Sequence, residues 1–121
     1  MALTAMDLVA AAKQHIREIS VADAKAQLAQ VRVLDVREPT EYTAGCLPEA
    51  VNIPRGVLEF KIDNLPIFKN DKDSPILVYC QSGGRSALAA EALQKLGYQP
   101  LSLAGGFNAW KDAGGDIITP A

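Results

Sequence analysis

The sequence holds few residues of the kinds that bind metal ions. It has two cysteines and one histidine among 121 residues. Cys46 and Cys80 do not form a Cys-x-x-Cys pair, and His15 is distant from both along the chain. Zinc sites need closely spaced cysteine and histidine ligands, so we expect no metal site. So small a number of cysteines also excludes a disulfide-dense scaffold.

Charge of one sign and long apolar runs are equally scarce. The formal net charge is only −2, which gives no basic surface for nucleic acid. No apolar run could span a bilayer, and residues 1–20 lack the charged-then-apolar order and the cleavage site of a secretory signal. We therefore expect a cytoplasmic protein, without a membrane or nucleic-acid partner, whose thiols are reduced.

Short apolar runs alternate with helix-like segments along the chain. The length favours a single domain over residues 1–121, in which residues 1–15 form an N-terminal helical extension. The alternation predicts an α/β fold with a central, mostly parallel five-stranded sheet flanked by helices on both faces. Strands are expected at 16–19, 31–36, 51–53, 76–79 and 100–103. Helices are expected at 3–14, 20–28, 39–45, 57–62, from the middle of 76–93 to Gly97, and at 107–112, with a polar surface connector at 64–75.

The most informative stretch is ILVYCQSGGRSALAAEAL, residues 76–93. A strand-like run ends at Cys80, a small polar loop follows, and an alanine- and leucine-rich helix comes next. The loop consists of Gln81, Ser82, Gly83, Gly84, Arg85 and Ser86. Free amides and the helix dipole favour an anion at such a place, so the thiol should lose its proton easily. A buried core cysteine is the simpler alternative, but it would gain nothing from a ring of amides, and we interpret Cys80 as a catalytic thiolate.

Several other residues admit two interpretations. Arg85 either contacts substrate or pairs with a carboxylate such as Glu41 to brace the loop. Asp35 and Arg37, at the end of the 31–36 strand, are expected to tie neighbouring loops together, and Glu41 to join that network rather than act as a base. Cys46 is expected to be a small buried residue, with resolution of an oxidised Cys80 as its alternative role. The sequence indicates no role for Tyr79 beyond its strand position.

Three blocks of the sequence resemble the rhodanese (sulfurtransferase) family. The cysteine loop is similar to the family's active-site loop. LDVREPTEYTAGCLPEAVNIP, residues 34–54, resembles the family's upstream block, and LAGGFNAWKDAGGDI, residues 103–117, resembles its terminal block. The blocks occur in the family's order and span roughly residues 16–118. The resemblance implies a rhodanese-like three-layer sandwich.

The resemblance also implies an activity. Cys80 would take a sulfane sulfur from a donor such as thiosulfate or a persulfide, and would pass it to cyanide or a thiol. The loop from Gln81 to Ser86 would bind the substrate through its amides, the hydroxyls of Ser82 and Ser86, and the charge of Arg85. Asp35, Arg37 and Glu41 would support the loop. No cofactor and no metal are implied, and a protein could serve as the sulfur acceptor.

Other functions compete with this one. Protein tyrosine phosphatases place five residues between their cysteine and arginine, whereas four separate Cys80 from Arg85. A partner-dependent sulfur relay or regulatory module and a Cys80/Cys46 redox sensor are further alternatives. The chain also departs from the family at two places. Gln81 and Ser82 stand where some thiosulfate-using relatives carry basic residues, and Cys46 stands where relatives usually have a histidine.

Overall fold

A five-stranded sheet lies at the centre of the structure, a computed structural model that describes residues 2–120. The strand order is β1-β5-β4-β2-β3, and every neighbouring pair is parallel. The strands are β1 (Glu18–Ile19), β2 (Arg32–Asp35), β3 (Val51–Asn52), β4 (Pro75–Tyr79) and β5 (Gln99–Leu103). The predicted α/β fold is therefore confirmed, and the strand ends differ from the expected ones by one or two residues.

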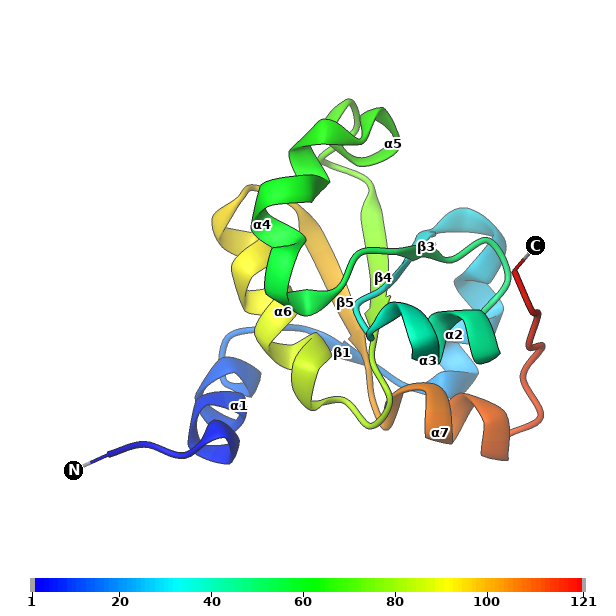
Figure 1. Cartoon of the computed structure of the whole chain (residues 1–121), viewed down its shortest axis with the longest axis horizontal. Coiled ribbons are helices and arrows are strands. Elements are labelled where there is room, and N and C mark those ends of the chain that lie inside the picture. Colours follow the sequence, from blue (N-terminus) through cyan, green and yellow to red (C-terminus); the bar gives the residue numbers. More distant parts are fainter. Residues whose placement is uncertain (1, 121) are drawn as a thin grey trace.

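Helices cover both faces of the sheet, as Figure 1 shows. One face packs against α4, α5 and α6, and the other packs against α2 and α7. The helices are α1 (Ala5–Lys13), α2 (Val21–Gln27), α3 (Pro39–Ala44), α4 (Leu58–Lys61), α5 (Pro66–Lys69), α6 (Gly84–Lys95) and α7 (Gly106–Asp112). Short 3₁₀ turns at Leu28–Gln30, Arg55–Val57 and Ile62–Asn64 complete the connections. Within residues 2–120, no helix is both long and apolar enough to cross a membrane.

Strand β4 shows why the sheet is covered on both faces. Its residues are apolar at successive positions because both of its faces are buried. Ile76, Val78 and Cys80 face the cluster beneath α6, whereas Leu77 and Tyr79 face the cluster beneath α7. The alternation along the strand therefore decides that the Cys80 side chain lies on the α6 side of the sheet.

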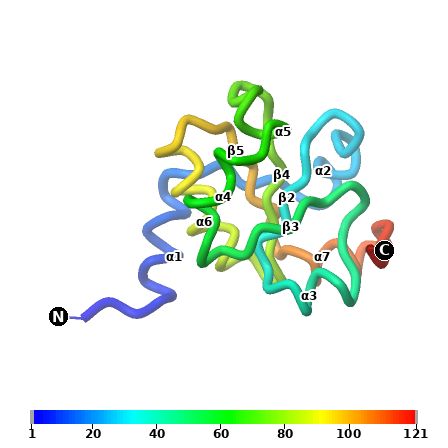
Figure 2. The backbone as a smooth tube through the Cα atoms, turned by 45° about the horizontal axis from the view of Figure 1, so that its top comes forward, coloured from blue at the N-terminus to red at the C-terminus, as the bar shows by residue number. Residues whose placement is uncertain are grey.

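Helix α1 lies outside the three layers and packs on the outer side of α6. Its first turn is closed by a capping box, in which Thr4 Oγ1 accepts from the Asp7 amide at 3.1 Å and the Asp7 carboxylate accepts from the Thr4 amide at 2.9 Å. Val9 and Ala12 are buried against Ala87 of α6. In Figure 2 this helix and the C-terminal segment lie on opposite sides of the molecule. The expected helix at residues 3–14 is confirmed.

The expected surface connector at residues 64–75 is wrong in part. Helix α5 lies within it and begins at Pro66, whose fixed φ suits the first turn of a helix. Phe68 is fully buried in the core cluster of the α6 face. The Arg32 guanidinium lies 5.4 Å from the centre of the Phe68 ring and donates a hydrogen bond to the Ile67 carbonyl at 2.8 Å. The apolar residues here, Leu65, Ile67 and Phe68, are too few to show a helical periodicity, which is why the sequence pattern missed this helix.

Phe68→Ala tests whether this segment contributes to the core. We expect the free energy of unfolding to fall by about 3–5 kcal/mol, because the change leaves a cavity beneath α5. Ile67→Ala is the matched control, since the Ile67 side chain is 55% exposed, and it should cost less than about 1 kcal/mol. Urea denaturation followed by circular dichroism measures both. Equal effects of the two substitutions would show that the segment is a loose loop.

Candidate active site

The site is built where β4 ends and α6 begins. Cys80 directly follows the strand and is only 1% exposed. Gly83 precedes α6 and has φ +111°, a left-handed conformation that favours glycine. This conformation turns the loop back on itself, so that the Gly83 amide donates to Cys80 Sγ at 3.0 Å. The predicted order of strand, cysteine, loop and helix is therefore present, but Gly84, Arg85 and Ser86, which were expected in the loop, form the first turn of α6.

Two opposing effects act on the Cys80 thiol. Burial raises its pKa, because a thiolate is poorly solvated there. The backbone amide and hydroxyl of Ser86, with the amides of Gly83 and Ser82, lower it, because they stabilise the anion. The second effect is larger, so the pKa of Cys80 lies below that of an ordinary thiol. This is the arrangement that activates a cysteine as a nucleophile.

A pair of buried hydroxyls lies beneath the loop. Ser86 Oγ is 3.6 Å from Cys80 Sγ and 2.9 Å from the Oγ of Ser102 on β5. Both serines are completely buried. The sequence analysis included Ser86 in the loop but missed Ser102, since a serine in a short apolar strand carries no signal of its own.

The first amides of α7 hold the opposite side of the loop. The Phe107 amide donates to the Cys80 carbonyl at 2.8 Å, and the Asn108 amide donates to the Gln81 carbonyl at 3.0 Å. The approach is so close that a Cβ on Gly106 would collide with the Cys80 carbonyl oxygen and the Gln81 backbone. The φ of Gly106 is +59°, which also favours glycine. The sequence predicted a helix at residues 107–112 but did not predict this contact.

Asp35 and Arg37 form a buried ion pair at the carboxyl end of β2. Arg37 is 2% exposed and Asp35 is completely buried. The Nε and Nη2 atoms of Arg37 donate to the Asp35 carboxylate, the Nη2 bond being 2.7 Å long. Arg37 Nη2 also donates to the Gly45 carbonyl at 2.6 Å, and Nη1 donates to Gln81 Oε1 at 3.1 Å. The pair thus reaches the cysteine loop through Gln81.

Tyr79 belongs to the same network, although its position in the sequence indicated no role beyond the strand. Its hydroxyl donates to Asp35 Oδ2 at 2.7 Å and accepts from the Leu47 amide at 3.1 Å. Burial and the Asp35 charge both raise the pKa of Tyr79 well above its ordinary value. The hydroxyl therefore stays protonated and acts as a fixed donor to Asp35.

Arg85 and Glu41 meet across the mouth of the site. Arg85 Nη1 and Nη2 donate to the two carboxylate oxygens of Glu41 at 2.7 and 3.0 Å. The hydrogen bond from Arg85 lowers the pKa of Glu41 to about 2, so Glu41 is ionised at neutral pH. Of the two interpretations of Arg85, the structure contains the carboxylate pair. Glu41 pairs with Arg85, and the charge of Arg37 also helps to lower the pKa of Glu41.

Cys46 lies on the other face of the sheet from Cys80. It is completely buried in the cluster beneath α7, and both cysteines are free thiols. Its backbone pairs with that of Ile118 through two hydrogen bonds of 2.9 Å. Burial raises the pKa of Cys46, in contrast to Cys80. The two thiols therefore differ both in location and in the direction of their pKa shifts.

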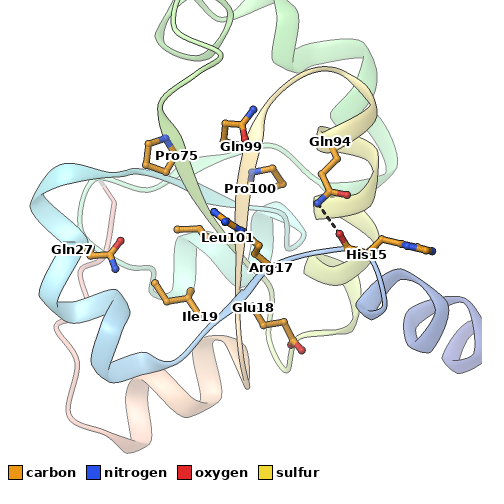
Figure 3. Close-up of a pocket in the computed structure, with 10 residues that line it drawn as sticks. All are labelled: His15, Arg17, Glu18, Ile19, Gln27, Pro75, Gln94, Gln99, Pro100 and Leu101. Carbon is orange, nitrogen blue, oxygen red and sulfur yellow. Dashed lines mark hydrogen bonds between the residues drawn. The ribbon is translucent and has the colours of Figure 1, made fainter.

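A groove of about 410 Å³ adjoins the loop between α3 and α7. Its walls include Gln81, Phe107, Ile117 and, at the rim, Lys111. A separate hollow of about 730 Å³ lies at the amino ends of β4 and β5, where Gln94 donates to the His15 carbonyl at 3.1 Å (Figure 3). Among residues 2–120, no cluster of histidine, cysteine and acidic side chains could hold a metal ion.

Comparisons with known proteins show which family and which solved structures this chain is similar to. Residues 20–113 match the model of a family described as the rhodanese-like domain. A sulfurtransferase of Allochromatium vinosum is 32% identical over 102 residues, covering 84% of this chain and 91% of that protein. The thiosulfate:glutathione sulfurtransferase of Saccharomyces cerevisiae is 34% identical over 98 residues, covering 73% of this chain and 70% of that protein. A solved structure from Rhodopseudomonas palustris, described as of unknown function and a possible tyrosine phosphatase, has a TM-score of 0.87 at 35% identity, covering 98% of this chain and 96% of that one.

Gly106→Ala tests the docking of α7 on the loop. A left-handed φ costs a non-glycine residue about 1–2 kcal/mol, and the collision with the loop backbone adds to this. We therefore expect the free energy of unfolding to fall by about 2 kcal/mol or more. Gly56→Ala is the control, because no atom lies within 4 Å of a Cβ placed there. A Gly106→Ala protein as stable as the control would contradict the close approach.

A thiolate titration tests the opposite shifts of the two cysteines. In the Cys46→Ser protein, the ultraviolet absorbance of the Cys80 thiolate should rise at lower pH than in the same protein unfolded in urea. In the Cys80→Ser protein, the Cys46 thiolate should appear at higher pH than in its unfolded form. Because the folded state favours the Cys80 thiolate, its stabilisation is present above the ordinary thiol pKa and is lost as pH falls through the folded pKa. Superimposed folded and unfolded curves would refute the amide effect.

Proposed function

Because the chain belongs to the rhodanese-like domain family of sulfurtransferases, we propose that it transfers a sulfane sulfur through a persulfide on Cys80. The observation that carries this proposal is the Gly83 amide directed at Cys80 Sγ at 3.0 Å, in a loop that lowers the pKa of the thiol. A buried thiol held in this way loses its proton more easily than an ordinary thiol, and the thiolate is the nucleophile.

The reaction would proceed by two displacements at sulfur. The Cys80 thiolate attacks the outer sulfur of the donor, and the donor's own sulfur–sulfur bond breaks. Sulfite leaves when thiosulfate is the donor, and a thiolate leaves when a persulfide is the donor. An acceptor thiolate or cyanide then attacks the outer sulfur of the Cys80 persulfide and regenerates the Cys80 thiolate. Each step breaks one bond to the transferred sulfur and forms another, so no external oxidant is required.

The loop would stabilise the charge as it moves onto the outer sulfur. Its amides act as an oxyanion hole does, and the loss of one such donor typically costs about 3–4 kcal/mol in the transition state. We assign substrate binding to the loop from Gln81 to Ser86, with Arg85 supplying a positive charge that Glu41 holds in place. Asp35 and Arg37 would support the loop through Gln81.

The charge and shape of the site support a proposal for the donor and the acceptor. Gln81 and Ser82 add no positive charge beside Cys80, so a dianion such as thiosulfate should bind more weakly than a monoanionic persulfide. The groove beside Gln81 and Phe107 is large enough for the organic part of a thiol. The similarity to the thiosulfate:glutathione sulfurtransferase of yeast supports a thiol as the acceptor. A reduced thiol suits a cytoplasmic location, which we propose on that ground.

Two competing functions have less support. A tyrosine phosphatase needs a wider loop around its phosphate than the four residues between Cys80 and Arg85 provide. A redox sensor would need Cys46 and Cys80 within disulfide reach, whereas they occupy clusters on opposite faces of the sheet. A relay that accepts sulfur only from a protein partner uses the same Cys80 chemistry and is therefore an outcome of the test below.

Intact-protein mass spectrometry tests the persulfide directly. After incubation with thiosulfate, mercaptopyruvate or a low-molecular-weight persulfide, the protein should gain the mass of one sulfur atom and lose it when cyanide is added. Cys80→Ser should abolish the gain because it removes the attacking thiolate. Cys46→Ser should keep it, which makes this variant the control for the second cysteine.

Two outcomes would change the proposal. A sulfur gain that persists in the Cys80→Ser protein would place the chemistry elsewhere. No gain from any of the three donors would exclude free turnover and favour the partner-dependent relay.

A further inference from the structure

Ser102 lies in β5 directly beneath the cysteine loop. Its backbone is held on both sides, since it pairs with Val78 of β4 and its amide donates to the Arg17 carbonyl at 2.9 Å. Its side chain is completely buried and its Oγ is 2.9 Å from Ser86 Oγ. Ser86 is the one hydrogen-bond partner of this hydroxyl among residues 2–120. The Ser102 hydroxyl can therefore influence Cys80 only through Ser86.

The Ser86 hydroxyl has more neighbours than it has hydrogens to donate. Its oxygen lies 3.6 Å from Cys80 Sγ, 3.3 Å from the Gly83 carbonyl oxygen and 2.9 Å from Ser102 Oγ. While Cys80 is a neutral thiol, its S–H can donate to Ser86 Oγ. The single Ser86 hydrogen is then free to point toward the Gly83 carbonyl or toward Ser102.

Ionisation of Cys80 reverses the direction of the hydrogen bond between Cys80 and Ser86. When the thiol proton leaves to water or to a buffer base, the sulfur becomes an acceptor only. The Ser86 hydroxyl can stabilise this anion only if its hydrogen turns toward the sulfur. Ser86 Oγ then has no donor of its own unless the Ser102 hydroxyl supplies one. A donor at Ser102 also polarises the Ser86 hydroxyl and strengthens the bond to the anion.

We propose that Ser102 is a positioning residue for Cys80: its hydroxyl donates to Ser86 Oγ and so directs the Ser86 hydrogen toward the anionic sulfur. The inference gives a purpose to a buried serine that the loop motif does not include. Its catalytic consequence rests on the proposed function, but the hydrogen-bond relay itself does not depend on sulfur transfer.

The thiolate titration of Cys80 tests the relay without a substrate. Measurements are made in the Cys46→Ser background, so that Cys80 is the only thiol. Ser102→Ala should raise the pH midpoint by about half a unit to one unit, as expected for the loss of one modest hydrogen bond. Ser86→Ala should raise it by at least as much. The double variant should match Ser86→Ala alone, because Ser102 acts only through Ser86.

Nearby charges and the packing of β5 could also move the titration midpoint of Cys80, so each needs a control. Arg85 is the charged side chain that interacts with the Cys80 charge, and its pair with Glu41 is left intact in every variant. Leu101→Ala perturbs β5 one residue away, on the opposite face of the sheet, and removes no hydroxyl. It should lower stability in urea denaturation without moving the Cys80 midpoint.

Two results would overturn the inference. One is an unchanged midpoint in Ser102→Ala, and the other is a Ser102→Ala shift of full size in the Ser86→Ala background. A midpoint that moves equally in Leu101→Ala would assign the effect to packing and would also overturn it. Because no sulfur is transferred in this titration, its failure leaves the persulfide result standing, and failure to form a persulfide leaves the relay standing.

Discussion

The buried charge of Arg37 is the constraint around which the site is assembled. A guanidinium removed from water is strongly destabilising unless all of its donors find partners. Arg37 takes these partners from separate segments: the Asp35 carboxylate after β2, the Gly45 carbonyl after α3, and the Gln81 side chain in the cysteine loop. The Phe107 ring of α7 lies 4.3 Å from the guanidinium and covers it. Satisfying one charge therefore fixes the relative positions of four parts of the chain.

The orientation of the loop follows from what lies on each side of it. On the outside, the first amides of α7 occupy the carbonyl oxygens of Cys80 and Gln81. Because a trans peptide unit is planar, the Gln81 carbonyl held outward leaves the Ser82 amide of the same peptide pointing inward at the sulfur. On the inside, the buried hydroxyls of Ser86 and Ser102 lie beneath the loop in place of apolar side chains. The sulfur is thus buried and yet surrounded by donors, which is how burial and a lowered pKa coexist.

Local patterns were enough to predict part of this arrangement. The run from Ile76 through Cys80 to the helix could be interpreted from neighbouring residues alone, and it gave the position of Cys80. The alternation of short apolar runs with helix-like segments predicted the sheet and its strands. Contacts between distant residues could not be inferred in the same way. The bond from Tyr79 to Asp35, the docking of α7 and the Ser86–Ser102 pair join segments whose approach depends on the whole fold. The Arg85–Glu41 pair was one of two interpretations that the sequence left open.

The two cysteines show how position alone shifts the pKa of a buried thiol in opposite directions. Both are almost completely buried, and burial by itself disfavours the thiolate of either. Cys46 pairs its backbone with Ile118, and desolvation is the main influence on its thiol. Cys80 lies one residue beyond a parallel strand, where a left-handed glycine turns an amide onto the sulfur. The same side chain is therefore easier to ionise than an ordinary thiol on one face of the sheet and harder to ionise on the other, which makes Cys80 the thiol that the proposed sulfur transfer would use.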